Sequence, residues 1–148
     1  MYEYKAKLKR VLDGDTIDCD IDMGFDIHKK VRVRLSGIDS PSCRTRDLTE
    51  KRYGLGAKRR LAELLENNGN EFVVLSHGVG KYGRCIGELF IQNPQSSIAR
   101  LKSVNNVLVG EGHAVKYLGG SKIMAKEELV WARKKSKEYV EKHIKPLD

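Results

Sequence analysis

Carboxylates appear in the sequence at points where neighbouring strands are expected to end. Asp13 and Asp15 flank Gly14 in "DGDT", a tight turn that aims a carboxylate, and Asp39 lies in "GIDSP". Two carboxylates from neighbouring strand ends are able to bind calcium or magnesium, because these hard cations prefer oxygen ligands. Taken alone, "DGD" is typical of a hairpin turn and "DSP" is a common turn opening. The carboxylates therefore predict a metal site only in combination with other residues.

Two arginines are candidates for binding the anion on which such a site would act. Arg34 alternates with the apolar Val33 and Leu35, which places it on the opposite face of a strand, and Arg84 follows the turn "KYG". Cutting a phosphodiester requires a water nucleophile and stabilisation of negative charge on the phosphoryl oxygens. A guanidinium group suits the second task because it recognises phosphate in a planar, bidentate way. Either arginine taken singly is typical of a surface residue.

Composition and charge favour a nucleic-acid partner. The chain has 148 residues, with 28 Lys and Arg against 20 Asp and Glu, which gives a net charge of +8 and a pI near 9.4. Such a surface attracts polyanions. The alternative, a basic protein whose lysines serve no nucleic-acid partner, stays open because net charge alone does not show a binding site. The length predicts one domain over residues 1–148.

The three cysteines indicate neither a disulfide framework nor a zinc site. Cys19, Cys43 and Cys85 are odd in number and match no zinc spacing, so we expect reduced thiols. Arginines beside Cys43 are able to lower the pKa of its thiol, but a cysteine nucleophile is not expected without a histidine partner. The opening "MYEYKAKLKR" lacks the apolar core of a signal peptide, and no run approaches a membrane span. We expect a cytosolic monomer with no membrane contact, with secretion after leader removal as the alternative.

The first third of the chain has the period-two alternation of strands. Strands are expected over 2–12 and 16–24 and in "KKVRVRLSGI". From about Glu50 the apolar residues recur at helical spacing, and "NNG" closes the segment near residue 69. The pattern predicts three strands followed by a helix.

Two more strands and two more helices follow. "EFVVLSH" and "GRCIGELFI" are expected to form a hairpin around "GVGKYG", and "SVNNVLVGEG" a short helix. Residues 122–143 are expected to form a charged helix, seated with help from Trp131. The apolar stripe of that helix consists of Leu129, Ala132, Ser136, Tyr139 and Val140. The order of elements predicts a mainly β fold with α (α+β), a small antiparallel five-stranded barrel with three helices, because five short strands cannot leave both edges bare.

The ordered motifs resemble those of the staphylococcal nuclease family, the thermonuclease-like domains. They are "DGDT", "RLSGIDSP", "YG" opening a helix, "KYGR" and "VNNVLVGEGHAVKY", and they extend from about Lys7 to the final helix. The resemblance implies an OB-fold barrel of five strands with three helices. Secreted members of this family are calcium-dependent phosphodiesterases that act on DNA and RNA.

The resemblance also implies roles for individual residues. Asp15 and Asp39 match the metal-binding aspartates, and Ser40 matches a residue whose backbone carbonyl binds the metal. Arg34 and Arg84 match the arginines that hold the phosphate and stabilise the transition state.

Two further matches concern the nucleotide pocket and the second helix. Lys81 and Tyr82 match side chains that line the nucleotide pocket. Asn105 matches a structural asparagine and is left out of the site. His113 stands where the family often has an apolar residue, so we expect a packing histidine.

The sequence departs from the family pattern at Ser42, where the family has its general-base glutamate. A hydroxyl is a poor proton acceptor, and general-base assistance contributes about 10² to 10⁴-fold in rate. Asp47 and Glu50 lie in the same loop, and Asp47 is the candidate substitute for the missing base. Arg44 and Arg46 in this loop either contact phosphate or are solvated. Weakened catalysis is therefore expected.

The sequence as a whole predicts a metal-dependent phosphodiesterase that hydrolyses DNA or RNA, with single strands favoured. Calcium is the favoured ion and magnesium the alternative. A catalytically inactive nucleic-acid-binding module on the same fold is the second hypothesis, and a protein-interaction domain is the third. The run "ARKKSK" in the last helix is interpreted as a solvated face, with phosphate contact as the alternative.

Overall fold

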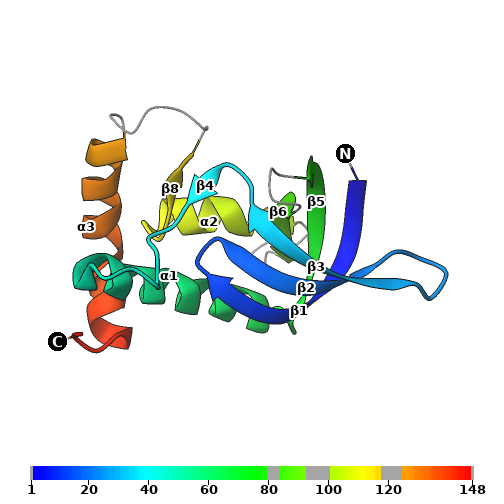
Figure 1. The fold of residues 1–148 in the computed structure, drawn as a ribbon, viewed down its shortest axis with the longest axis horizontal. Coiled ribbons are helices and arrows are strands. Elements are labelled where there is room, and N and C mark those ends of the chain that lie inside the picture. The colour runs from blue at the N-terminus through cyan, green and yellow to red at the C-terminus, as the bar shows by residue number, and fades with distance from the viewer. Residues whose placement is uncertain (1, 80–83, 93–100, 118–124, 148) are drawn as a thin grey trace.

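The computed structural model describes residues 2–79, 84–92, 101–117 and 125–147. Figure 1 shows the longer strands toward the right of the molecule and the last helix at the left, with the other helices and some short strands between them. In chain order the elements are β1 (Tyr2–Asp13), β2 (Thr16–Asp22), β3 (His28–Leu35), β4 (Ile38–Asp39), α1 (Leu48–Glu66), β5 (Glu71–Val79), β6 (Cys85–Gln92), β7 (Leu101–Ser103), α2 (Val104–Gly110), β8 (Val115–Lys116) and α3 (Ala125–His143).

Five of the strands close into a barrel. The hydrogen-bonded order is β3-β2-β1-β5-β6, and a parallel pairing of β3 with β6 joins the two ends, with Val33 opposite Cys85 and Leu35 opposite Gly87. Closure removes the exposed edges of the sheet. The predicted five-stranded barrel with three helices is confirmed. The short β7 extends β6, and β4 pairs with β8 outside the barrel.

The second strand shows how the alternating sequence builds the barrel wall. Ile17, Cys19 and Ile21 are buried, while Asp18 lies on the outer face. The Asp18 carboxylate accepts hydrogen bonds from Arg32 Nε at 2.8 Å and from an Arg10 guanidinium nitrogen at 3.3 Å. The acidic face of this strand is therefore balanced by arginines on its two neighbours.

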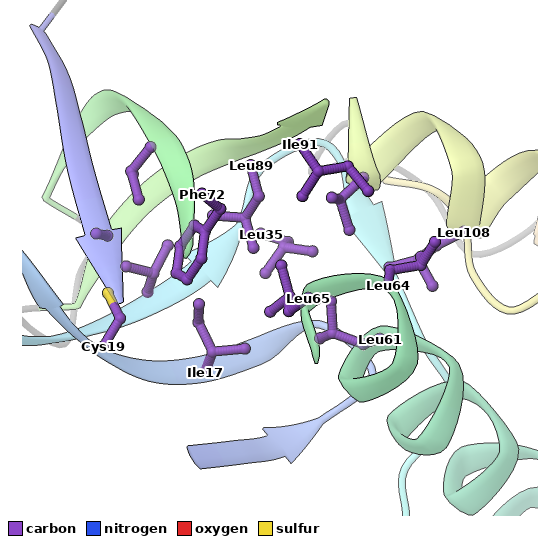
Figure 2. Packing of buried hydrophobic residues seen from close by; sticks show 14 of the residues in the cluster. Ile17, Cys19, Leu35, Leu61, Leu64, Leu65, Phe72, Leu89, Ile91 and Leu108 are labelled. Atoms are coloured by element: carbon purple, nitrogen blue, oxygen red, sulfur yellow. The ribbon is translucent and has the colours of Figure 1, made fainter. Parts of the chain in front are cut away.

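Helix α1 covers one open end of the barrel. Figure 2 shows Leu61 and Leu65 of this helix pointing toward Leu35 and Leu89 of the barrel strands. All four side chains are almost fully buried. Burying aliphatic side chains of this size stabilises the fold by about 1.5 to 3 kcal/mol each. The helix is thus fixed on the barrel by its apolar stripe.

The last helix, α3, is buried along a narrower stripe than expected. Ala132, Ser136 and Val140 are buried, and Ser136 Oγ donates a hydrogen bond to the Ala132 carbonyl oxygen at 2.8 Å. Leu129 and Trp131 are 38% and 51% exposed. Trp131, expected to help seat the helix, lies about 100° of rotation from the buried stripe, and its half-covered side chain borders Val109 and Val115.

The three cysteines are unpaired, as expected. None of the helices in the described ranges is long and apolar enough to span a membrane.

Candidate active site

Three strand ends bring two carboxylates and a guanidinium group together. Asp15 lies in the turn between β1 and β2, Arg34 near the end of β3, and Asp39 in β4. Two guanidinium nitrogens of Arg34 lie 3.4 Å from Asp15 Oδ2 and 3.4 Å from Asp39 Oδ1. The structure therefore assembles these predicted site residues into one cluster.

The Asp15 carboxylate is held in place by its neighbours. Its Oδ1 accepts a hydrogen bond from Thr16 Oγ1 at 2.9 Å, and its Oδ2 accepts one from the Ser40 backbone N–H at 3.0 Å. Its own carbonyl oxygen accepts the Leu35 N–H at 2.8 Å. Since the side chain is largely buried, this orientation is established without a ligand.

Asp39 is the more open carboxylate, with 54% of its side chain exposed. Partial burial raises the pKa of Asp39 above its ordinary value. The neighbouring Asp15 and Glu50 carboxylates also raise the pKa, while Arg34 lowers it. Asp15 and Asp39 thus share the guanidinium group of Arg34, and a pair of neighbouring carboxylates is a suitable place for a cation.

The oxygen atoms at the site fit a hard cation. Ser40 Oγ is buried beside Asp15 and has no hydrogen-bond partner among the described residues. Asp15 and Asp39 offer carboxylate oxygens around Arg34, and the expected Ser40 carbonyl would add a third oxygen. The described ranges hold no group of three His, Cys, Asp or Glu side chains that could bind a metal. A cation here would need water or a phosphate oxygen to complete its shell, as Mg²⁺ and Ca²⁺ commonly do.

Two glycines let the site and its loop approach α1 closely. A Cβ on Gly14 would lie 2.5 Å from Ala57 Cβ of α1 and 2.9 Å from Ser40 Cβ. A Cβ on Gly54 of α1 would lie 2.4 Å from the Ser42 carbonyl oxygen. Neither position has room for a side chain, so α1 is the platform on which the "DGD" turn and the following loop rest.

Ser42 is engaged in the loop backbone. Its Oγ accepts a hydrogen bond from the Arg44 N–H at 3.1 Å, and its own N–H donates to Glu50 Oε1 at 3.4 Å. The Ser42 hydroxyl therefore stabilises a local turn.

Cys43 is buried beside the Asp13 carboxylate. Its Sγ lies 2.8 Å from Asp13 Oδ1. Burial, with this neighbouring carboxylate, raises the pKa of the Cys43 thiol. Arg44 lowers this pKa, as expected of a neighbouring arginine, and Lys58 does too, but burial and Asp13 outweigh them.

The proposed substitute base Asp47 has a structural role. It is the N-cap of α1, and its Oδ1 accepts hydrogen bonds from the Thr49 and Glu50 N–H groups at 3.0 and 3.2 Å. This cap explains why α1 begins at Leu48, two residues before the expected start.

A cleft of about 310 Å³ opens beside the cluster. Its walls come from the segment after β4, the first turn of α1, the segment before β8, and α3. The lining residues are Asp39, Ser40, Pro41, Asp47, Glu50, Gly112, Ala114, Val115, Leu129, Ala132 and Arg133.

Arg133 in this cleft differs from the solvated face expected for "ARKKSK". Its guanidinium carbon lies 4.6 Å from the Tyr53 ring centroid, and its Nε is buried without a hydrogen-bond partner among the described residues. Lys134 and Lys135 are exposed, as expected. No sequence pattern separates Arg133 from its neighbours, because the difference lies in the side of α3 that faces the cleft.

Arg84 directly precedes β6. The next residue, Cys85, is in register with Val33, so Arg84 lies immediately before the strand that pairs with the strand of Arg34. Arg84 is partly buried and has an interaction partner. Lys81 and Tyr82 lie outside the described residues, so their predicted place in the nucleotide pocket stays a prediction.

Two residues left out of the site are structural. Asn105 is buried, accepts the Leu89 N–H through Oδ1 at 3.2 Å, and donates through Nδ2 to the Ser36 carbonyl at 2.9 Å. His113 is 3% exposed, and its ring packs edge-on against Tyr139. Both expectations, a structural asparagine and a packing histidine, agree with the structure.

The sequence model of the family described as staphylococcal nuclease homologue matches residues 32–142. The chain belongs to the staphylococcal nuclease family. The matched range includes Arg34, Asp39 and Arg84, while Asp15 precedes it.

Named relatives from three organisms resemble this member of the staphylococcal nuclease family. Micrococcal nuclease of Shigella flexneri is 32% identical over 117 residues, which cover 78% of this chain and 59% of the relative. Protein ParB of Escherichia coli is 30% identical over 116 residues, covering 78% and 58%. Staphylococcal-like nuclease CAN1 of Arabidopsis thaliana is 33% identical over 94 residues, covering 64% and 24%. The chain thus spans less than two thirds of each relative, and the family relationship supports a nuclease-like function connected with nucleic acid.

Proposed function

We propose that the chain is a metal-dependent phosphodiesterase that hydrolyses DNA or RNA. The observation that carries this proposal is the contact of Arg34 with both Asp15 and Asp39, at the joined strand ends of a staphylococcal nuclease barrel. Calcium is the favoured ion, magnesium the alternative, and single strands the favoured substrate of a monomer. The cytosolic location stays a prediction.

The residues divide the work as follows. Asp15, Asp39 and Ser40 would hold the cation, which neutralises charge on the phosphoryl oxygens when it is bound. Arg34 is placed beside the same carboxylates to contact a phosphoryl oxygen, and Arg84 is proposed as the second such group. The oxygen of a water molecule forms a bond to phosphorus while the ester P–O bond breaks, and the leaving oxygen takes up a proton.

A second candidate is an inactive nucleic-acid-binding module on the same barrel. It is favoured by the state of Ser42, whose hydroxyl accepts the Arg44 N–H and is neutral at ordinary pH. The site residues Asp15, Asp39, Arg34 and Arg84 are nonetheless all present, which favours the enzyme.

The test is cleavage of an end-labelled single-stranded oligonucleotide with calcium, magnesium or a chelator. We expect cleavage with metal and none with chelator. Asp15→Asn should lower the rate by about 100-fold, since it removes a cation ligand, while Asp26→Asn on the exposed β2–β3 hairpin should not. Arg84→Ala should lower it by a similar factor.

Each alternative has its own outcome. Binding of the oligonucleotide without cleavage in any metal would support the inactive module. Absence of both binding and cleavage would favour a protein-interaction domain. Cleavage that Arg84→Ala leaves unchanged would show that the site is wrongly assigned.

A further inference from the structure

The proposed hydrolysis leaves one chemical role unfilled. The attacking water must lose a proton as its oxygen bonds to phosphorus, and a carboxylate that accepts this proton accelerates such a reaction by about 10² to 10⁴-fold. Ser42 cannot fill the role, because its hydroxyl is a weak base and already accepts the Arg44 N–H. A carboxylate elsewhere in the cleft would supply this acceleration if it lay close to the attacking water.

The described part of the cleft presents three carboxylates. Asp39 is paired with Arg34 and is a ligand in the proposed cation site. Asp47 accepts two N–H groups at the start of α1, and moving it would cost about 1 kcal/mol of helix stability. Glu50 is the remaining carboxylate on the cleft wall.

The Glu50 side chain does not take the usual direction for its place in the helix. Asp47 and Glu50 have the spacing of a capping box, in which the glutamate accepts the N–H of the capping residue. Here the Asp47 N–H donates to Thr45 Oγ1 at 3.2 Å instead. Glu50 Oε1 accepts the Ser42 N–H at 3.4 Å, and Oε2 has no hydrogen-bond partner among the described residues.

The helix also fixes the distance between Glu50 and the site. Glu50 and Gly54 are four residues apart, so they lie on the same face of α1. The Ser42 backbone packs directly against Gly54, where no Cβ would fit. The Glu50 carboxylate is thus held next to Ser42, the position at which the family has its glutamate. Its negative charge contributes to the raised pKa of Asp39.

We propose that Glu50 is the general base of this site. An oxygen of its carboxylate takes a proton from the attacking water, the water oxygen bonds to phosphorus, and the ester oxygen leaves with the electrons of the broken P–O bond. The leaving oxygen takes a proton from solvent, and Glu50 returns its proton to solvent afterwards. This inference rests on the proposed hydrolysis. The base would come from α1, whereas the family supplies it from the position that Ser42 occupies here.

The test compares Glu50→Gln with Glu66→Gln, the same change at the exposed last residue of α1. Single-stranded DNA cleavage gives kcat and KM at saturating calcium, and calorimetry gives the calcium affinity without substrate. Glu50→Gln should lower kcat by about 100-fold or more, with KM and calcium affinity changed by less than about threefold. Glu66→Gln should match the wild type. Adding Ser42→Glu to Glu50→Gln should restore part of kcat, which excludes misfolding as the cause of the loss.

Three results would overturn the assignment in distinguishable ways. If the wild type and Glu50→Gln cut with the same kcat, Glu50 is not the base and the hydrolysis proposal stands. If Glu50→Gln weakens calcium binding by about tenfold or more, Glu50 is a metal ligand. If the wild type cuts no faster than Asp15→Asn in any metal, the hydrolysis proposal fails, and the role of Glu50 fails with it.

Discussion

Arg34 is the residue on which the charge balance of the site depends. It lies within 3.4 Å of both Asp15 and Asp39 and also donates to the Leu35 carbonyl at 3.0 Å. Without it, two carboxylates would face one another with no guanidinium between them. Unlike a surface ion pair, this contact involves a largely buried partner, Asp15, so its loss should be measurable.

Replacing Arg34 should affect both cleavage and stability. Arg34→Ala should lower the cleavage rate by about 100-fold, because a charge-stabilising group is lost from the transition state. It should also lower the free energy of unfolding, more in chelator than in calcium, since a cation would separate the two carboxylates. Urea unfolding and oligonucleotide cleavage measure these effects.

Arg32→Ala is the matched control for this change. Arg32 lies on the same strand and pairs with Asp18 on the outer face of the barrel. An exposed pair contributes about 0 to 1 kcal/mol, so cleavage should stay at the wild-type rate. Equal cleavage by Arg34→Ala and Arg32→Ala would contradict the assigned site.

Sequence reasoning located the ends of strands better than it located side-chain directions. Asp15, Arg34 and Asp39 were predictable because strand ends that neighbour one another bring their residues together. The direction of the Glu50 side chain was not predictable, because the spacing of Asp47 and Glu50 also fits a capping box. Two hydrogen bonds distinguish the arrangements: the Asp47 N–H donates to Thr45 Oγ1, and Glu50 Oε1 accepts the Ser42 N–H.

Helix α1 is the element that supports the whole site. It packs on the "DGD" turn at Ala57, on the loop at Gly54, and supplies Asp47 and Glu50 at its first turn. The longer strands and the helices of the protein were predictable from the periodic spacing of their apolar residues, and so was the barrel. The two-residue strands β4 and β8 were not, because two residues are too few to show a period.

A methyl group at Gly54 should displace the loop. The Cβ of Gly54→Ala would meet the Ser42 carbonyl oxygen and the Cys43 nitrogen, and overpacking of this kind costs about 1 to 3 kcal/mol. The expected result is a lower urea midpoint and slower cleavage. Gly110→Ala is the control, since nothing lies within 4 Å of its Cβ and alanine favours a helix by up to about 1 kcal/mol. If Gly54→Ala is as stable as Gly110→Ala, the loop does not rest on α1.

His113 is buried where the helices meet, so the free energy of unfolding should depend on pH. Burial lowers the pKa of His113 to about 4, with Glu111 and Glu63 raising it and Arg60 lowering it. The unfolded histidine has a pKa near 6.5, so the unfolded chain binds the extra proton between pH 6.5 and pH 4. Stability is therefore lost as the pH falls through this window, by about 2 kcal/mol between pH 7 and pH 4.5.

A non-titrating ring isolates this effect. His113→Phe retains an aromatic contact with Tyr139 but cannot take up a proton. Urea unfolding at several pH values should show a steeper loss for the wild type than for His113→Phe. Parallel pH profiles would show that His113 is not held neutral by burial.

The net charge of +8 makes the protein attract polyanions over its entire surface. The order of motifs along the chain was enough to predict the barrel, since closure follows from strand number and the need to cover edges. It was not enough to place Arg133 in the cleft, because that depends on how α3 lies against α1.

Binding of single-stranded DNA should weaken steeply with salt. In chelator, which prevents cutting, the logarithm of the affinity should fall with the logarithm of salt concentration with a slope of about −2 to −3, as expected for three or four phosphate contacts. Fluorescence anisotropy measures this slope. A flat dependence would instead favour the protein-interaction domain.

The parallel pairing that closes the barrel has a consequence for the order of folding. Asp15, Arg34 and Asp39 are near neighbours in the chain and can meet as soon as the first hairpins form. Arg84, the proposed second arginine of the site, is brought beside β3 only when β6 pairs with β3, and closing the chain between Val33 and Cys85 costs entropy and comes late. A newly made chain would therefore hold the acidic half of its site well before its second arginine, so cutting is expected only from molecules that have finished folding.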